Sequence, residues 1–137
     1  ALGPIAAPEL RRLADENGLT ICATHVAWNR LVEAFDEVVE EHHALGCHYL
    51  TVPIIPKELR NAEGYHRFAR EATEVGLRLR EHNLQLAYHN HSFEFERYEG
   101  RTGLQILFDE SDPFALMAEL DTYWVQHGGG DPSAWIQ

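Results

Sequence analysis

The densest group of side chains that could do chemistry lies in the segment YHNHSFEFE, residues 88–96. His89 and His91 lie two residues apart, and Glu94 follows three residues later. Because side chains alternate along a strand, the two imidazoles would share one face. Imidazole nitrogens with carboxylate oxygens suit Zn²⁺, Mn²⁺ or Co²⁺, whereas Ca²⁺ prefers oxygen ligands alone. The segment is either a polar strand end or part of a metal site, and other segments must supply partners.

Candidate partners occur at the ends of two further apolar segments. LTICATHVAW contains His25, and FALMAELDTYWV contains Glu119 and Asp121, which would share one face of a strand. Burying an unpaired carboxylate is costly, so Asp121 in an apolar segment favours a ligand role. A single histidine at a strand end is more often a hydrogen-bonded structural residue than a ligand. Trp124 is open to two interpretations, a core residue or a stacking wall for a sugar ring.

The other polar signals are weaker. His42, His43 and His48 fall on a predicted helix and at a strand start, where solvated positions are expected. The GGG at residues 128–130 lacks the GxGxxG spacing of a phosphate-binding loop, so a flexible turn is predicted there.

Alternating strands and helices position these side chains. Short apolar runs predict strands at residues 19–28, 47–55, 84–95 and 114–125, and helical periodicity predicts helices at 30–47, 65–79 and 103–112. A first helix is expected from Pro8 to Asn17-Gly18, and another begins at Asp131-Pro132. This βαβ rhythm predicts a parallel α/β sheet, in which function lies at the carboxyl ends of the strands. Four such units fit either part of a barrel or an open flavodoxin-like sheet.

Composition limits the class of protein. The chain has 137 residues, 45% of them hydrophobic and 24% charged, which predicts one folded domain over residues 1–137. The net charge of −11 argues against nucleic acid and anionic membranes as partners and suits a divalent cation. Cys22 and Cys47 are expected to be free thiols in a reducing, cytoplasmic compartment. No signal peptide or membrane span is expected.

Two long blocks resemble a known family. YHNHSFEF and ELDTYWVQHGGGDP are similar to the sugar phosphate isomerase/epimerase family, the xylose isomerase-like TIM barrels, and GLTICATHV and LGCHYLTVPIIP fit the preceding strands. The resemblance implies a partial (β/α)₈ TIM barrel of about four parallel βα units, corresponding to strands three to six of the family barrel. Residues 1–137 would then be a piece of a larger barrel.

The resemblance also implies roles for individual residues. Metal ligands are expected at His89, Glu94 and Asp121, with Asp121 at the sixth-strand aspartate of the family. Many relatives carry a glutamate where this chain has His89, and Glu94 is the nearest acidic substitute. Glu94 and His91 are the expected catalytic residues for proton transfer. A divalent metal (Mn, Co, Zn or Mg) is the implied cofactor.

Substrate contacts are implied for three further residues. His25 falls where related barrels place a strand-three histidine near the metals, and Tyr123 and Trp124 would line the sugar pocket. The implied reaction is a metal-dependent sugar isomerisation or epimerisation by proton transfer through an enediolate.

Alternatives stay open at this point. The same chemistry serves a dehydratase or lyase on keto-sugars or inositol derivatives, and the sequence does not separate the two. Phosphodiester hydrolysis, as in endonuclease IV-like barrels, is disfavoured by the acidic charge. A further alternative is an inactive half-barrel fragment that self-associates through its open sheet edges.

Overall fold

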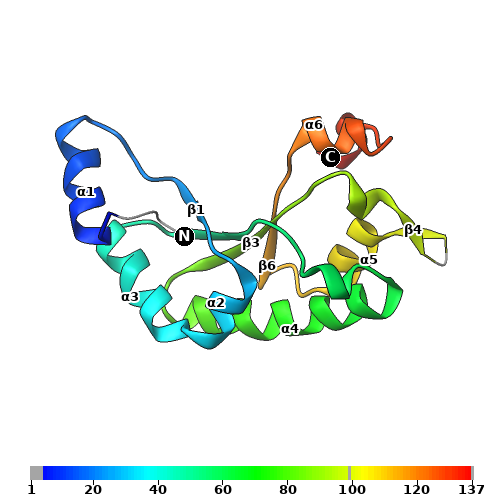
Figure 1. The fold of residues 1–137 in the computed structure, drawn as a ribbon, viewed down its shortest axis with the longest axis horizontal. Helices are drawn as coiled ribbons and strands as arrows, with labels where there is room; N and C mark the ends of the chain where they lie inside the picture. Colours follow the sequence, from blue (N-terminus) through cyan, green and yellow to red (C-terminus); the bar gives the residue numbers. More distant parts are fainter. Residues whose placement is uncertain (1–4, 99, 137) are drawn as a thin grey trace.

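A computed structural model describes residues 5–98 and 100–136 of the chain. Its centre is a four-stranded parallel sheet in the order β1-β2-β3-β6 (Figure 1). The strands are β1 (Ala23–His25), β2 (Tyr49–Val52), β3 (Gln85–His89) and β6 (Leu116–Glu119). A short antiparallel hairpin, β4 (Arg97–Tyr98) and β5 (Arg101–Thr102), lies between β3 and β6 in the chain. The parallel order confirms the α/β fold class.

Helices precede and follow the strands. α1 precedes β1, α2 and α3 lie between β1 and β2, α4 between β2 and β3, and α5 between β3 and β6. In Figure 1, α2, α3 and α4 lie together on one side of the sheet. The helices are α1 (Ala7–Glu16), α2 (Trp28–Glu33), α3 (Phe35–Leu45), α4 (Ala62–Glu81), α5 (Gly103–Glu110), α6 (Thr122–His127) and α7 (Pro132–Trp135), with 3₁₀ turns η1 (Lys57–Leu59) and η2 (Phe93–Phe95).

The sheet has one covered and one uncovered face within the described residues. Leu50, Leu86 and Tyr88 are fully buried and belong to the core formed with the helices. The alternate positions point to the other face, where Tyr49 and Met117 are 44% and 45% exposed. We call this second face the inner face, because it would face the interior of the partial barrel that the sequence resemblance implies.

Two predicted strands are shorter than expected because polar side chains end them. The strand predicted at 84–95 ends at His89, and Phe93–Phe95 forms η2 instead. The strand predicted at 114–125 ends at Glu119, and Asp121 accepts a hydrogen bond from the Trp124 N–H as the N-cap of α6. This capping offers the backbone an alternative to the sheet ladder. Asp121 is therefore not on a strand, in contrast to the prediction.

The helix predicted at 30–47 is interrupted. Ala34 has φ −128° and ψ 42°, so α2 ends before it and α3 begins after it. The predicted helix start at Asp131-Pro132 is confirmed, since Asp131 accepts from the Ser133 N–H and caps α7. In the described part of the chain, no helix has the length and apolar character that crossing a membrane requires.

The prediction that His42 is solvated is wrong. Its side chain lies on the inward side of α3 and is 1% exposed. Nδ1 donates to the Val38 carbonyl at 2.6 Å, and Nε2 therefore accepts from the Thr24 hydroxyl, also at 2.6 Å. Burial lowers the pKa of His42, which favours the neutral imidazole. His43 and His48 are exposed, as predicted.

Candidate metal centre

Three side chains from three strand ends converge on the inner face. The Nε2 atom of His25 lies 2.7 Å from Oε2 of Glu119, and Nδ1 of His89 lies 3.2 Å from the same oxygen. One potential ligand atom from each of the three lies within 4.8 Å of the others. We call His25, His89 and Glu119 the strand-end cluster.

The register of the sheet explains this convergence. His25 is the partner of Thr51 on β2, and His89 is the partner of Glu119 on β6. Parallel strands bring their carboxyl ends to the same edge, and alternation puts these four side chains on the inner face. Thr51 donates its hydroxyl to Oε1 of Glu119 at 3.2 Å, which leaves Oε2 for the two imidazoles.

The donor set fits a divalent transition metal. Two imidazoles and one carboxylate are a known ligand combination of catalytic zinc sites, in which three protein ligands leave a position for substrate or water. The two histidines differ in exposure, since the side chain of His25 is 48% exposed and that of His89 only 17%. An ion at the cluster would therefore be held on one side and open to solvent on the other.

Asp121 lies beside the cluster without joining it. Its Oδ2 atom is 3.8 Å from Nε2 of His89, on the opposite edge of the ring from Glu119. Its Oδ1 atom accepts from the Trp124 N–H at 3.1 Å. The Asp121 carboxylate therefore lies next to His89 and caps α6. The carboxylate within the cluster is that of Glu119, whereas the sequence suggested Asp121.

Glu94, which the sequence predicted to be a metal ligand and catalytic residue, lies outside the strand-end cluster. Its side chain is fully buried and belongs to none of the groups of convergent ligand atoms among the described residues. Both oxygens already accept hydrogen bonds, Oε1 from the Tyr88 hydroxyl at 2.7 Å and Oε2 from the His91 N–H at 2.9 Å. Burial raises the pKa of Glu94, and the hydrogen bonds oppose that shift.

His91 connects the cluster to an aromatic group. Its ring centroid lies 5.0 Å from that of His89, 5.4 Å from that of Trp124 and 5.8 Å from that of Phe93. Its Nδ1 atom is buried and has no hydrogen-bond partner within the described residues. Burial, followed by the charge of His89, lowers the pKa of His91, so its neutral form is favoured.

The two aromatic residues predicted to contact substrate are both on α6. Trp124 is half-buried against His91, whereas Tyr123 is 65% exposed and stacks on His127 with an interplanar angle of 9°. Trp124 thus lies next to the site, and Tyr123 extends the same aromatic surface outward.

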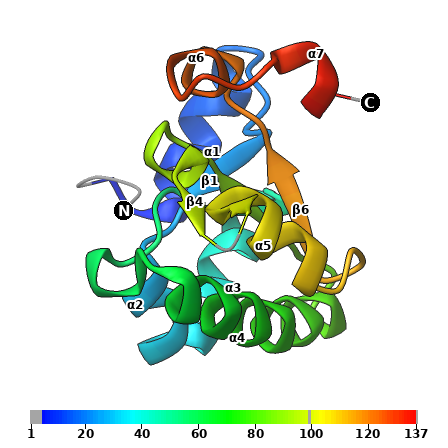
Figure 2. The same ribbon diagram turned by 90° about the vertical axis from the view of Figure 1, so that its right-hand side faces the viewer.

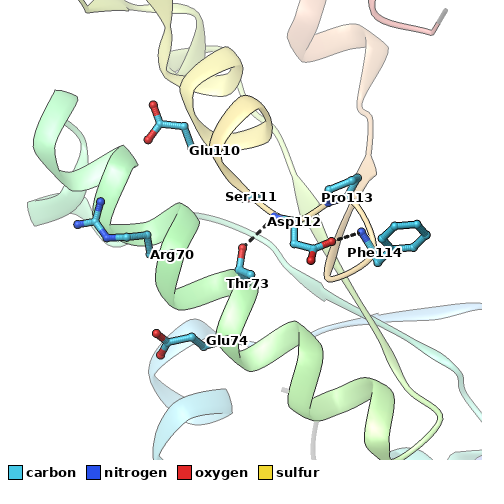
Figure 3. A pocket seen from close by; sticks show the side chains of 8 residues that line it. All are labelled: Arg70, Thr73, Glu74, Glu110, Ser111, Asp112, Pro113 and Phe114. Carbon is cyan, nitrogen blue, oxygen red and sulfur yellow. Dashed lines mark hydrogen bonds between the residues drawn. The ribbon is translucent and has the colours of Figure 1, made fainter.

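Space for a small ligand adjoins Glu119. A hollow of about 220 Å³ on the inner face is lined by Thr51, Ala87, Met117 and Glu119, among others. A separate hollow of about 670 Å³ lies at the other end of the sheet, between α4 and the turn before β6 (Figure 3). There Asp112 donates its N–H to Thr73 and accepts from the Phe114 N–H, so these groups hold the turn. Of these two hollows, the one beside Glu119 adjoins the cluster.

The sequence placed Glu119 beside Asp121 among the candidate partners, but the ligand role was assigned to Asp121. Glu119 is on the same face as Met117 and opposite His89 in the register. The family resemblance directed attention to Asp121 instead, two residues later. His25 was expected to contact substrate, and the structure places it within the strand-end cluster.

Comparisons with known proteins agree with this architecture. No family model matches the chain, and no curated protein does either. Among solved structures, two sugar phosphate isomerase/epimerase proteins from Parabacteroides distasonis ATCC 8503 are similar, with TM-scores of 0.83 and 0.87 and identities of 25% and 21%. They match 96% and 100% of this chain, which spans 52% and 60% of theirs.

A third similar structure is a xylose isomerase-like TIM barrel/4-hydroxyphenylpyruvate dioxygenase fusion protein, with a TM-score of 0.68 and 16% identity over 96% of this chain and 22% of that one. The chain therefore spans little more than half the length of the two isomerase/epimerase structures. The resemblance inferred from the sequence is confirmed at the level of structure: the chain has the fold of part of a sugar phosphate isomerase/epimerase, a xylose isomerase-like TIM barrel.

Proposed function

We propose that this chain carries the strand-end part of a divalent-metal-dependent sugar isomerase or epimerase site. The observation that carries the proposal is the convergence of His25, His89 and Glu119 at one edge of a sheet with this fold. The metal class follows from the mixed nitrogen and oxygen donors, with Mn²⁺, Co²⁺ and Zn²⁺ as candidates.

Each part of the site has a defined task in this proposal. A divalent ion held by His25, His89 and Glu119 would supply Lewis-acid stabilisation for the oxyanion that develops when a hydroxy-carbonyl sugar loses its α-proton. Glu119 accepts the Thr51 hydrogen bond through Oε1, which orients Oε2 toward the ion position. His91 is the candidate for moving the proton, because its ring lies between His89 and Trp124. Trp124 provides an apolar wall for the carbon face of the sugar.

The binding half of the proposal is tested by calorimetric titration of Co²⁺ and Mn²⁺ into the metal-free chain. We expect one site per chain, with affinity lowered at least tenfold in Glu119→Ala and His89→Ala. His48→Ala is the matched control, because His48 is an exposed histidine at the other end of β2. Equal affinities in all four proteins would refute the assignment of the cluster.

The chemical half is tested by solvent exchange. The metal-loaded chain is incubated with aldoses and ketoses in D₂O, and proton NMR follows loss of the proton next to the carbonyl. We expect exchange that requires metal, Glu119 and His91, with His91→Phe as the variant that keeps the ring but not the nitrogens. If the chain binds metal but no sugar exchanges its proton, the proposed reaction is contradicted although the metal site stands.

A further inference from the structure

The buried carboxylate of Glu94 holds, through hydrogen bonds, the segment that carries His89 and His91. It accepts from the His91 N–H at 2.9 Å, two residues after the end of β3. Through its other oxygen it accepts from Tyr88, the residue before His89. One carboxylate therefore holds the chain on both sides of the His89-Asn90 pair.

The same network reaches β2. The Tyr88 oxygen accepts from the Ile55 N–H at 3.1 Å, and both residues are fully buried. Ile55 follows β2, so the Glu94–Tyr88–Ile55 chain joins the ends of two adjacent strands.

Asn90 makes the corresponding connection to β6. Its side chain is 1% exposed, donates to the Asp121 carbonyl at 3.2 Å and accepts from the Asp121 N–H at 2.9 Å. This pair of bonds fixes the backbone two residues after Glu119. Asn90 offers no ligand atom to the cluster, and its role is to hold β3 and β6 in place beside it.

We propose that Glu94 and Asn90 are positioning residues for the strand-end cluster, acting on His89 and Glu119 through the backbone rather than touching metal or sugar. The metal-affinity part of this inference rests on the function proposed above. Neighbouring groups that orient ligands affect metal affinity by about 10- to 100-fold when they are removed.

The chemistry of the network explains why a carboxylate is present at position 94. Two donors, a hydroxyl and an N–H, point at the two oxygens of Glu94. A glutamine has one acceptor oxygen and one amide nitrogen, so it can accept from only one of the two donors, and the other donor loses its acceptor. Leaving a buried donor unpaired is costly, so losing this carboxylate disturbs at least one of the two contacts.

The first test compares Co²⁺ affinity and the Co²⁺ visible absorption spectrum in wild type, Glu94→Gln and Asn90→Ala. We expect a 10- to 100-fold loss of affinity and an altered spectrum in both variants. Gln85→Ala is the matched control, since Gln85 is buried at the opposite end of β3 and bonds across to the Ala115 carbonyl before β6. It should lose stability while keeping wild-type affinity and spectrum.

The second test needs no metal. Amide hydrogen exchange of the metal-free chain should show at least tenfold faster exchange at His91 in Glu94→Ala and at Asp121 in Asn90→Ala, relative to the core amides of Leu50 and Leu86. Gln85→Ala should leave both ratios unchanged. Unchanged ratios in the Glu94 and Asn90 variants would overturn the inference. Each ratio compares amides within one protein, so a difference in overall stability between variants does not alter this conclusion.

The two tests separate failure of the inference from failure of the proposed function. A wild-type chain that does not bind Co²⁺ contradicts the metal site, and the exchange ratios still decide whether Glu94 and Asn90 hold the strand ends. Wild-type Co²⁺ affinity in both variants contradicts the inference while leaving the metal site intact.

Discussion

The two carboxylate oxygens of Glu119 have different partners, and these partners orient the carboxylate within the candidate site. Oε1 accepts from Thr51, while Oε2 faces the two imidazoles of His25 and His89. A carboxylate fixed by a neighbouring hydroxyl presents its free oxygen in one orientation, which is how surrounding hydrogen bonds tune a metal ligand.

Thr51→Val should weaken metal binding by about tenfold, because valine keeps the volume and removes the hydroxyl that orients Glu119. Thr51→Ser restores the hydroxyl and should recover most of the affinity. Calorimetric titration of both variants measures the effect, and a Thr51→Val protein with wild-type affinity would show that the hydrogen bond does not matter for binding.

The burial of His42 predicts how the stability of the fold depends on pH. Its pKa in the folded protein lies below its ordinary value of 6.5, mainly because burial disfavours the charged ring. As pH falls below 6.5, the unfolded chain therefore takes up this proton first, and stability decreases by up to about 1.4 kcal/mol per pH unit until the folded form titrates as well.

Urea unfolding of wild type and His42→Gln at pH 7.5 and 5.5 measures this contribution. The variant should be less stable at pH 7.5 because the Thr24 and Val38 hydrogen bonds are disturbed, yet it should lose less stability on acidification. An equal loss in both proteins would contradict the assignment to His42.

At the scale of elements, close packing of α4 positions β6. Gly76 approaches the chain just before β6 so closely that an added Cβ would lie 2.2 Å from the Ala115 carbonyl oxygen. A backbone oxygen cannot swing aside as a side chain can, so only glycine fits here without moving the strand that carries Glu119.

Gly76→Ala should destabilise the chain by about 1–3 kcal/mol, the usual range for overpacking, although alanine gains about 1 kcal/mol in helix propensity. Leu77→Ala, at an adjacent exposed position of α4, is the control and should cost less. Thermal or urea unfolding decides, and a stabilised Gly76→Ala protein would show that β6 shifts freely.

The sequence predicted the elements better than their ends. The parallel strands and their order along the chain followed from apolar runs alternating with helical periodicity, and His89, a predicted ligand, lies in the strand-end cluster. The positions of Glu94 and Asp121 could not be read from the sequence, because each depends on a particular hydrogen bond. Glu94 turns into the core to meet Tyr88, and Asp121 caps α6 instead of continuing β6.

Burial of His42 was missed for a similar reason. The run EVVEEHH carries enough charge to suggest an exposed helix face, but one imidazole in it meets the Thr24 hydroxyl of β1. A partner 18 positions away in the chain leaves no local pattern. Single polar residues whose partners are distant are therefore the least predictable part of this fold.

At the scale of the whole molecule, the inner face carries both the candidate site and exposed apolar side chains. Tyr49 and Met117 are nearly half exposed. The strands β1 and β6 are the edges of the described sheet, and Figure 2 shows β6 at its side. In a closed barrel this face is a packed interior. Exposed apolar surface beside unpaired strand edges favours association with another chain.

We therefore expect the isolated chain to self-associate with increasing concentration, and Met117→Lys to reduce that association. Sedimentation velocity over a hundredfold concentration range measures it, with Phe114→Lys as a control because Phe114 is exposed at the other end of the sheet. If Phe114→Lys reduces self-association and Met117→Lys does not, the contact between chains lies elsewhere.

The central claim is that three strand ends of this chain form one metal site. X-ray absorption spectroscopy of the Co²⁺-loaded chain tests it most directly, because the fine structure counts the imidazoles bound to the ion. We expect two imidazoles in wild type and one in His25→Ala. A spectrum without bound imidazole, or one that His25→Ala leaves unchanged, would contradict the claim.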